Sequence, residues 1–565
     1  MPDRVVDYLT AAVSELGVTH IFGVDGANIE DLYDAIFDAG GHPAGIVAKH
    51  EFSAATMADG YARSTGGLGV VAATSGGGAM NLVAGLAESY TSRVPVLALI
   101  GQPPTSLEGQ GAFQDSSGLA ESFDATALFA TISRYCARVT DPAELPGQFA
   151  AAVAAAEEGG PAVLLLPKDV QQQAMPETGT GAEQERVLAR RNATPATAST
   201  NTIAEELAAA RRTGKVVIIA GDQVARDHAR AELAELVTAL DASIGLAPDA
   251  KDVYANTGPG YCGVAGSMGH AELREALASA SACLLIGTRL PVTARAGLEA
   301  VIADIPVLSI GALPPYPAAL HVTGTDLAAT IRDLLPRLDA TPAAATAPAA
   351  DLTPMPVPGA AGPGLRYRTV VEAIQRELPT GADIFADAGN TGASVVHYLR
   401  VPEGGRFVVA LGMGGMGYAF GAGIGSAFAR HDAADGPHRT IVIAGDGAFY
   451  MHGMELHTAI EHDLPITFVV FNNNAHAMCV TREQLYYRDR YSFNRFRTAQ
   501  LGAGIAAMFP GLPARTVDDP DDLTDALRGS FAATGPSFVE IVCDPDEIPP
   551  FLPFLSTIDA SRSTP

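Results

Sequence analysis

Two oxygen-bearing side chains in the last third of the chain follow neighbouring apolar segments. Asp446 stands in a Gly445-Asp446-Gly447 turn after residues 440–444, and Asn473, 27 positions further on, follows residues 466–471. Both segments have the composition of buried parallel strands, whose carboxyl ends meet at one edge of a sheet. Carboxylate and carboxamide oxygens suit magnesium, and glycines before a helix start suit a phosphate. The pattern predicts a magnesium and phosphate site, or, as the alternative, an ordinary turn beside an asparagine-rich loop.

A third candidate for chemistry, Glu51, follows the apolar segment 45–49 and starts a predicted helix. The small residues Ala54, Ala55 and Ala58 would let this helix pack closely. A glutamate at a helix N-terminus is most often only a favourable partner of the helix dipole. It can also act as an acid or base in catalysis. The surrounding residues, HEFSAATMADGYAR and then TSGGGAMNLVAGLAESY, favour the catalytic role, because they match a known family.

Together these motifs resemble the thiamine diphosphate-dependent enzymes of the acetolactate synthase and pyruvate decarboxylase group. GDG followed by NN is similar to the diphosphate-binding signature, and the segment around Glu51 is similar to the pyrimidine-binding domain. The resemblance covers nearly the whole chain. It implies that Glu51 binds the pyrimidine ring and favours the imino tautomer needed to deprotonate the thiazolium C2. It also implies self-association, as a homodimer or homotetramer, with the active site at the dimer interface.

The resemblance implies further site residues. The magnesium ligands would be Asp446, the Asn473 side chain and the Ala475 carbonyl, and Met416 would support the bent cofactor. The other implied cofactor-binding positions are Asn390, Thr391, Gly414, Gly445, Gly447, Ala448, His476 and Met478.

A glycine pattern before the GDG turn has a second interpretation. Gly412, Gly414 and Gly417 form a GxGxxG motif, which alone would indicate a nicotinamide site. No acidic residue ends a following strand at a suitable distance, so a nicotinamide-dependent oxidoreductase is the weaker hypothesis. A catalytically silent relative is also disfavoured, because Glu51, Asp446 and Asn473 are all present.

The reaction type depends on the loop after the apolar segment 94–101. Phe113-Gln114-Asp115 is similar to the FQE element of acetolactate synthases, whereas pyruvate-type decarboxylases carry adjacent histidines there. Gln114 and Phe113 would act in catalysis, since a neutral Gln can orient an acceptor carbonyl without readily protonating the enamine. We therefore expect a carboligase that decarboxylates a 2-oxo acid and joins the enamine to a second carbonyl. The alternative is a non-oxidative 2-oxo acid decarboxylase or carbon–carbon lyase.

The substrate pair is not determined by these residues. Acetolactate synthases usually carry Trp where this chain has Arg482, and Cys479 stands on the same predicted helix. A guanidinium there could bind a carboxylate or phosphate of the substrate, or it could be an ordinary solvated side chain. Gln114, Cys479 and Arg482 are the candidate substrate contacts.

The elements that must position these residues form three blocks of α/β pattern, in which short apolar segments alternate with amphipathic helices. This alternation predicts three tandem doubly wound parallel-sheet domains. They are a pyrimidine-binding domain (1–172), a central domain (201–336) and a diphosphate-binding domain (365–545), with linkers at 173–200 and 337–364 and a tail at 546–565.

The central block contains GSMGH and GTRLPVTARAG, which are similar to flavin-binding segments of the synthases. The acidic strand of those segments is missing. We therefore expect a vestigial domain without FAD, with FAD binding as the alternative.

Composition excludes several functions. The net charge of -27 argues against nucleic acid or an anionic membrane as a partner. No apolar run reaches the length that crosses a bilayer. The five dispersed cysteines give no zinc or disulfide framework. The N-terminus lacks the pattern of a secretory signal, so we expect a cytoplasmic enzyme acting on small molecules.

Overall fold

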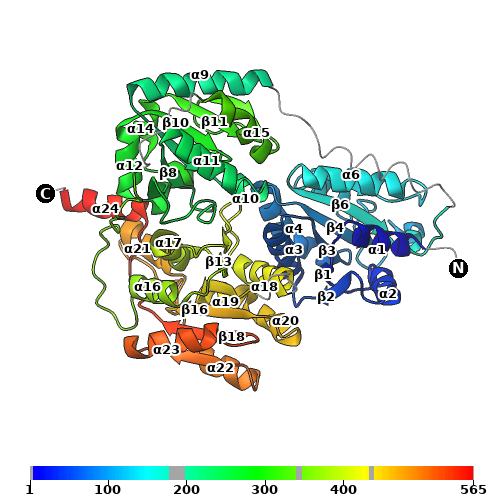
Figure 1. The fold of residues 1–565 in the computed structure, drawn as a ribbon. Coiled ribbons are helices and arrows are strands. Elements are labelled where there is room, and N and C mark those ends of the chain that lie inside the picture. Colours follow the sequence, from blue (N-terminus) through cyan, green and yellow to red (C-terminus); the bar gives the residue numbers. More distant parts are fainter. Residues whose placement is uncertain (1–3, 177–196, 339–346, 432–437, 564–565) are drawn as a thin grey trace.

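The computed structural model describes residues 4–176, 197–338, 347–431 and 438–563 (Figure 1). It contains three α/β domains, each built on a six-stranded sheet in which all neighbouring strands are parallel. Strands such as β4, β6 and β16 are buried along their whole length, because helices cover both faces of each sheet. The predicted fold class of three tandem doubly wound parallel-sheet domains is confirmed.

The first domain has the strand order β2-β1-β3-β4-β6-β5. Apolar clusters lie on both faces of its sheet. Its strands are β1 (His20–Val24), β2 (Ala44–Val47), β3 (Gly69–Ala73), β4 (Val96–Gln102), β5 (Tyr135–Arg138) and β6 (Pro161–Pro167). Its helices are α1 (Val5–Glu15), α2 (Glu30–Asp38), α3 (Glu51–Thr65), α4 (Gly77–Ser92), α5 (Ala125–Ala130), α6 (Leu145–Glu157) and α7 (Lys168–Gln171).

The central domain has the strand order β12-β11-β10-β7-β8-β9 and a hydrophobic core of its own. Its strands are β7 (Lys215–Ala220), β8 (Ser243–Leu246), β9 (Tyr261–Val264), β10 (Ala280–Ile286), β11 (Val307–Gly311) and β12 (Leu320–Thr323). Its helices are α9 (Thr197–Thr213), α10 (Gln223–Arg226), α11 (Arg230–Leu240), the 3-10 helix η3 (Gly266–Met268), α12 (Ala271–Ala278), α13 (Val292–Arg295), α14 (Glu299–Ala303) and α15 (Leu327–Leu334).

The third domain has the strand order β14-β13-β15-β16-β18-β17. Its strands are β13 (Asp383–Ala386), β14 (Phe407–Val409), β15 (Thr440–Gly445), β16 (Ile466–Asn472), β17 (Ala514–Val517) and β18 (Ser537–Val542). Its helices are α16 (Tyr367–Glu377), α17 (Gly389–Tyr398), α18 (Tyr418–His431), α19 (Asp446–His452), α20 (Leu456–Glu461), α21 (Ala477–Tyr487), α22 (Leu501–Met508), α23 (Pro520–Phe531) and α24 (Leu552–Ser563).

Helices α3 and α18 join the first domain to the third, and both contribute to one hydrophobic cluster (Figure 1). Glycines allow the two helices to approach this closely. A Cβ atom on Gly60 would lie 1.9 Å from the Ala422 carbonyl oxygen, and one on Gly425 would lie 1.9 Å from that of Met57. Any larger residue at either position would separate the helices.

The predicted boundaries differ from the structure at the C-terminus. The segment 546–565, predicted as a tail, contains α24, which packs against α21 and η3. Helix α9 begins inside the predicted linker 173–200, of which residues 177–196 lie outside the described residues. Residues 347–364 of the other linker contain neither helix nor strand. Among the helices described, none combines the length and the apolar composition that a membrane span requires.

Candidate active site

Asp446 lies at the carboxyl end of β15, where α19 begins. Its side chain is buried, and Oδ2 accepts a hydrogen bond from the Ala475 backbone N–H at 3.2 Å. Oδ1 is also buried and has no hydrogen-bond partner within the described part of the chain. Burial raises the pKa of Asp446 to about 7. A buried carboxylate oxygen without a partner is costly, so its position fits a bound cation.

Asn473 follows β16 on the neighbouring strand, as the spacing predicts. Its Nδ2 donates to the hydroxyl of Tyr367 at 2.8 Å, and its Oδ1 accepts from the Ala475 N–H at 3.0 Å. The Ala475 amide therefore lies between the Asp446 carboxylate and the Asn473 carboxamide. Tyr367 is fully buried, and the sequence analysis did not find it because it lies 106 positions from Asn473.

The amino end of α17 approaches the same strand ends. Asn390 and Thr391 are buried, and a Cβ atom on Gly445 would lie 3.6 Å from Thr391 Oγ1. The Asn390 Nδ2 donates to the Glu547 carbonyl oxygen at 3.3 Å, whereas its Oδ1 is buried without a partner among the described residues. The cofactor-binding roles of Asn390 and Thr391 stay predictions.

Met416 and His476 meet at Gly447, beside Ala448. A Cβ atom on Gly447 would lie 2.5 Å from His476 Cδ2 and 3.2 Å from Met416 Cε. A glycine is therefore required here by the two neighbouring side chains. Met478 is half-buried and packs against the core of the third domain.

A buried carboxylate from the first domain holds the loop before Met416. Glu88, on α4, accepts hydrogen bonds from the backbone N–H groups of Gly412 at 3.2 Å, Met413 at 2.6 Å and Gly414 at 3.3 Å. With the Ser92 hydroxyl, which donates to Oε1 at 2.7 Å, four donors satisfy this carboxylate, which is 2% exposed. Glu88 lies 324 positions from Gly412, so no local sequence pattern could have identified it.

Glu51 begins α3 in the first domain. Its Oε2 accepts a hydrogen bond from Asn81 Nδ2 at 2.9 Å, and a Cβ atom on Gly78 would lie 3.1 Å from its Oε1. The half-exposed carboxylate therefore lies over the loop 74–78. His50, the N-cap residue of α3, accepts a hydrogen bond from the Phe52 N–H through its ring Nδ1.

Gln114 lies at the same loop. Thr74 Oγ1 donates to Gln114 Oε1 at 3.0 Å, and a Cβ atom on Gly76 would lie 2.8 Å from Gln114 Cβ. Gln114 has a φ of 60°, which is uncommon for a residue other than glycine. Such conformations cluster at functional sites. Residues 74–78, which include the start of α4, thus contact Gln114 at Thr74 and Gly76 and approach Glu51 at Gly78. Phe113 is 74% exposed.

The predicted residues therefore form two groups. In the described part of the chain, no hydrogen bond joins Glu51 or Gln114 to Asp446 or Asn473. Arg482 is exposed on α21, and its guanidinium contacts the Cys479 sulfur at 3.7 Å. The two groups lie in different domains, the first and the third.

Comparisons with known families agree with this architecture. Three models of thiamine pyrophosphate enzymes match the chain. They are the N-terminal TPP binding domain at residues 3–121, the central domain at residues 200–314 and the C-terminal TPP binding domain at residues 387–541. The chain belongs to the thiamine pyrophosphate enzyme family.

Within this family the chain is similar to acetolactate synthases. It is 28% identical to the probable acetolactate synthase large subunit of Methanocaldococcus jannaschii, over 96% of this chain and 92% of that protein. It is 26% identical to the acetolactate synthase isozyme 2 large subunit of Escherichia coli, over 95% of each. It is also 28% identical to the sulfoacetaldehyde acetyltransferase of Castellaniella defragrans, over 95% of this chain and 92% of that protein.

A solved structure shares the fold at low sequence identity. The benzoylformate decarboxylase of Polynucleobacter necessarius superposes with a TM-score of 0.81 at 18% identity, covering 97% of this chain and all of that one. The prediction of an acetolactate synthase-like, thiamine diphosphate-dependent enzyme is confirmed. The roles of single residues, magnesium and FAD stay predictions.

Proposed function

We propose that this protein is a carboligase of the acetolactate synthase type, which decarboxylates a 2-oxo acid and joins the remaining fragment to a second carbonyl. The main support is the segment 74–78, which contacts the neutral Gln114 at Thr74 and Gly76 and approaches Glu51 at Gly78. A side chain that does not readily give up a proton favours carbon–carbon bond formation over release of an aldehyde. The relatives named as acetolactate synthases support the same reaction class.

Thiamine diphosphate, when bound, would supply carbanion chemistry that amino-acid side chains do not provide. Glu51 would bind the pyrimidine ring and hold a proton at its N1′ atom. Gln114 would orient the acceptor through its carboxamide, with Phe113 beside it. Met416 and the Gly414 carbonyl would support the pyrimidine end, and Asn390 and Thr391 the diphosphate end.

The residues present fit a magnesium ion at the diphosphate end. Asp446 Oδ1 is buried and unpartnered, and the oxygen ligands that magnesium prefers are supplied by Asp446, Asn473 and the Ala475 carbonyl. Gly445, Gly447 and Ala448, at the start of α19, would leave the backbone free to approach the phosphates. FAD is not expected, and the enzyme is proposed to work in the cytoplasm.

Each active site is proposed to combine Glu51 of one copy with Asp446 of a second copy. The family resemblance implies this arrangement. Exposed apolar side chains near both groups, Met80, Phe113, Met413 and Met451, would be covered by the second copy.

Product analysis tests the proposed reaction. Purified protein is incubated with pyruvate, thiamine diphosphate and magnesium, with and without a panel of 2-oxo acid and aldehyde acceptors, and the products are followed by mass spectrometry. Hydroxyketones are expected. Carbon dioxide with free aldehyde alone would contradict carboligation and support the decarboxylase or lyase alternative. Cofactor binding without pyruvate turnover would point to another donor and make Arg482 the first residue to test.

Gln114 is expected to control the ratio of the two products. Gln114→His introduces a side chain that can protonate the reacting carbon, and His tolerates the positive φ better than most residues. The ratio of aldehyde to hydroxyketone should rise at least about tenfold. Gln110→His, an exposed position in the same loop, is the matched control. An unchanged product ratio in Gln114→His would contradict the proposal that Gln114 lies in the acceptor site.

Tyr367 is expected to position Asn473 for the metal. Tyr367→Phe removes the hydroxyl that accepts from Asn473 Nδ2 and leaves that buried donor unpaired, at a cost of about 1–3 kcal/mol in the free energy of unfolding. The magnesium concentration that gives half-maximal cofactor binding should rise about 10- to 100-fold. Losses of this size are typical when a group that orients a metal ligand is removed.

Denaturant unfolding and magnesium titration of the apoprotein measure the two effects. Tyr254→Phe, a variant that removes a hydroxyl bonded to a backbone carbonyl in the central domain, is the control. If Tyr367→Phe lowered the free energy of unfolding but left the magnesium affinity unchanged, Tyr367 would contribute to stability and not to the metal site.

A further inference from the structure

Residues 410–417, which we name the glycine loop, join β14 to α18 and contain two predicted cofactor-binding residues, Gly414 and Met416. Gly414 is exposed and Met416 is half-buried. The Gly414 carbonyl oxygen and the Met416 N–H make no hydrogen bond to any described residue. The glycine loop can therefore offer a ligand one acceptor and one donor, two residues apart.

Glu88, on α4 of the first domain, anchors the first half of the glycine loop. Its Oε2 accepts from the N–H groups of Met413 at 2.6 Å and Gly414 at 3.3 Å, and its Oε1 accepts from that of Gly412 at 3.2 Å. Three successive backbone N–H groups that face one anion form a concave anion-binding nest. In the described part of the chain no ion pair involves Glu88, so the nest and the Ser92 hydroxyl supply its hydrogen bonds.

Asp387, which follows β13 in the third domain, anchors the other end of the glycine loop. The residue is 2% exposed, and its Oδ1 and Oδ2 accept from the N–H groups of Gly417 and Ala419, each at 3.0 Å. Residues 415 and 416 thus lie between two segments that are bound to buried carboxylates. One carboxylate belongs to the first domain and the other to the third, so the position of the loop depends on how these domains dock.

The glycines explain why the loop needs such anchors. A Cβ atom on Gly412 would lie 2.2 Å from Thr91 Oγ1 and 2.8 Å from Glu88 Oε1, so only glycine lets the backbone approach α4 this closely. Gly414 has a φ of 66°, which also favours glycine. A glycine-rich backbone has many accessible conformations, and the hydrogen bonds to Glu88 select one of them.

We propose that Glu88 is a positioning residue, which fixes the Gly414 carbonyl and the Met416 N–H for the pyrimidine half of thiamine diphosphate. This role rests on the proposed function, because it requires the cofactor to bind at the predicted site. Glu88 is buried beneath the loop and would not touch the cofactor itself. A loop that must become ordered during binding lowers the affinity for the ligand. Loss of Glu88 should therefore weaken contacts to the pyrimidine half and spare the diphosphate half.

A comparison of two ligands tests this role in the full-length protein, after a chelator has removed metal and cofactor. Thiamine diphosphate and inorganic pyrophosphate are titrated by calorimetry at one fixed magnesium concentration. Pyrophosphate can occupy only the diphosphate half of the site. Glu88→Gln replaces one carboxylate oxygen with an NH₂ group, which cannot accept a hydrogen bond from the loop. The affinity for thiamine diphosphate should fall at least about tenfold, whereas that for pyrophosphate should stay within about twofold.

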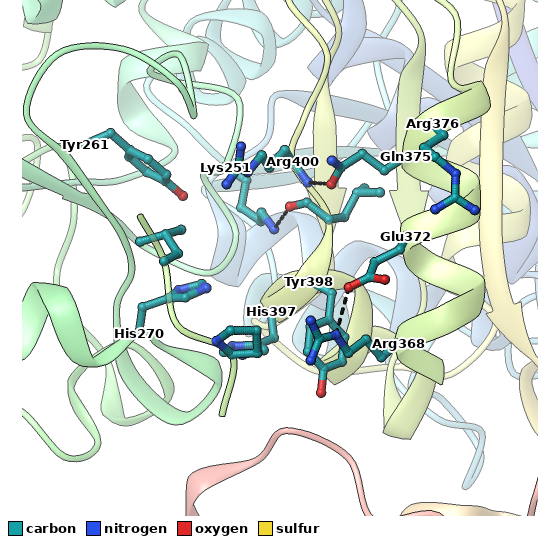
Figure 2. A pocket seen from close by; sticks show the side chains of 13 residues that line it. Lys251, Tyr261, His270, Arg368, Glu372, Gln375, Arg376, His397, Tyr398 and Arg400 are labelled. Carbon is teal, nitrogen blue, oxygen red and sulfur yellow. Dashed lines mark hydrogen bonds and ion pairs between the residues drawn. The ribbon is translucent and has the colours of Figure 1, made fainter. Parts of the chain in front are cut away.

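Two further variants complete the experiment. Glu372→Gln is the matched control, because its carboxylate bonds to Arg368 at 2.7 Å in a separate pocket between the central and third domains (Figure 2). It should bind both ligands like the wild type. Glu88→Asp keeps the buried charge but is one methylene shorter, so it should weaken thiamine diphosphate binding by less than Glu88→Gln does. It also provides the test if Glu88→Gln does not fold.

Two outcomes would overturn the role of Glu88 alone. They are an unchanged affinity for thiamine diphosphate in both Glu88 variants, and an equal loss of affinity for the two ligands, which would mean that Glu88 supports the fold as a whole. If the wild type did not bind thiamine diphosphate, or bound it without competition from pyrophosphate, the proposed cofactor site would be wrong and the role of Glu88 with it.

Discussion

Replacing Glu51 with Gln is expected to lower kcat by about 10²- to 10⁴-fold while thiamine diphosphate still binds. The amide has nearly the shape of the carboxylate and can keep a hydrogen bond to Asn81, but it cannot hold the proton at the pyrimidine ring. The loss should therefore appear in turnover and not in cofactor affinity. Steady-state rates with pyruvate and cofactor titration measure the two quantities separately.

Glu158→Gln is the matched control for this variant, because it makes the same change at an exposed position of the same domain. It should behave like the wild type. If Glu51→Gln kept more than about one tenth of the wild-type rate, an acid–base role for Glu51 would be wrong. If it lost the cofactor altogether, Glu51 would be a binding residue whose catalytic role is not established.

Replacing Asp446 with Asn is expected to abolish magnesium-dependent cofactor binding, with a loss in affinity of more than about 100-fold. Removing a group that only orients a metal ligand already lowers the affinity for the metal about 10- to 100-fold. Asp446 would bind the metal directly and is the one charged member of the proposed ligand set, so its removal should cause a larger loss. Equilibrium binding of thiamine diphosphate at varied magnesium measures this loss. Asp522→Asn, exposed on α23, is the control, and an unchanged magnesium requirement in Asp446→Asn would contradict the proposed metal site.

The pH dependence of magnesium binding provides a second test of Asp446. Burial raises the pKa of this carboxyl to about 7 in the apoprotein, so below pH 7 a magnesium ion must displace a proton. The apparent affinity should fall by up to about tenfold per pH unit below pH 7 and should level off above it. A flat profile between pH 5.5 and about pH 8 would mean that Asp446 is ionised throughout or does not bind the metal.

The strands that the sequence predicts are those with continuous apolar composition. β4, β6 and β16 are buried along their length, so their composition alone identifies them. Six strands were not predicted: β1, β5, β8, β9, β12 and β17. Of these, β12 and β17 are short, lie on sheet edges and are only partly buried. Edge strands carry little hydrophobic signal, and their position depends on the neighbouring strand.

Some contacts in the candidate site could likewise be predicted from the sequence, and others could not. The spacing of Asp446 and Asn473 along two adjacent strands predicts their proximity, because parallel strands end at one sheet edge. Glu88 and Tyr367 were not predictable, since each reaches its partner only through the packing of elements far apart in the chain. The requirement for glycine at position 447 likewise became clear only from the positions of Met416 and His476.

Hybrid dimers test most directly the central claim, that Glu51 of one copy and Asp446 of another act on the same cofactor. Glu51→Gln and Asp446→Asn chains carrying different tags are co-produced, and the rate of the mixture is compared with that of each variant alone. Half of the randomly formed dimers are hybrids, and each hybrid contains one site with both residues intact. The mixture should therefore recover about one quarter of the wild-type rate. Recovery of no activity, in a mixture shown by its tags to contain hybrids, would contradict the shared active site.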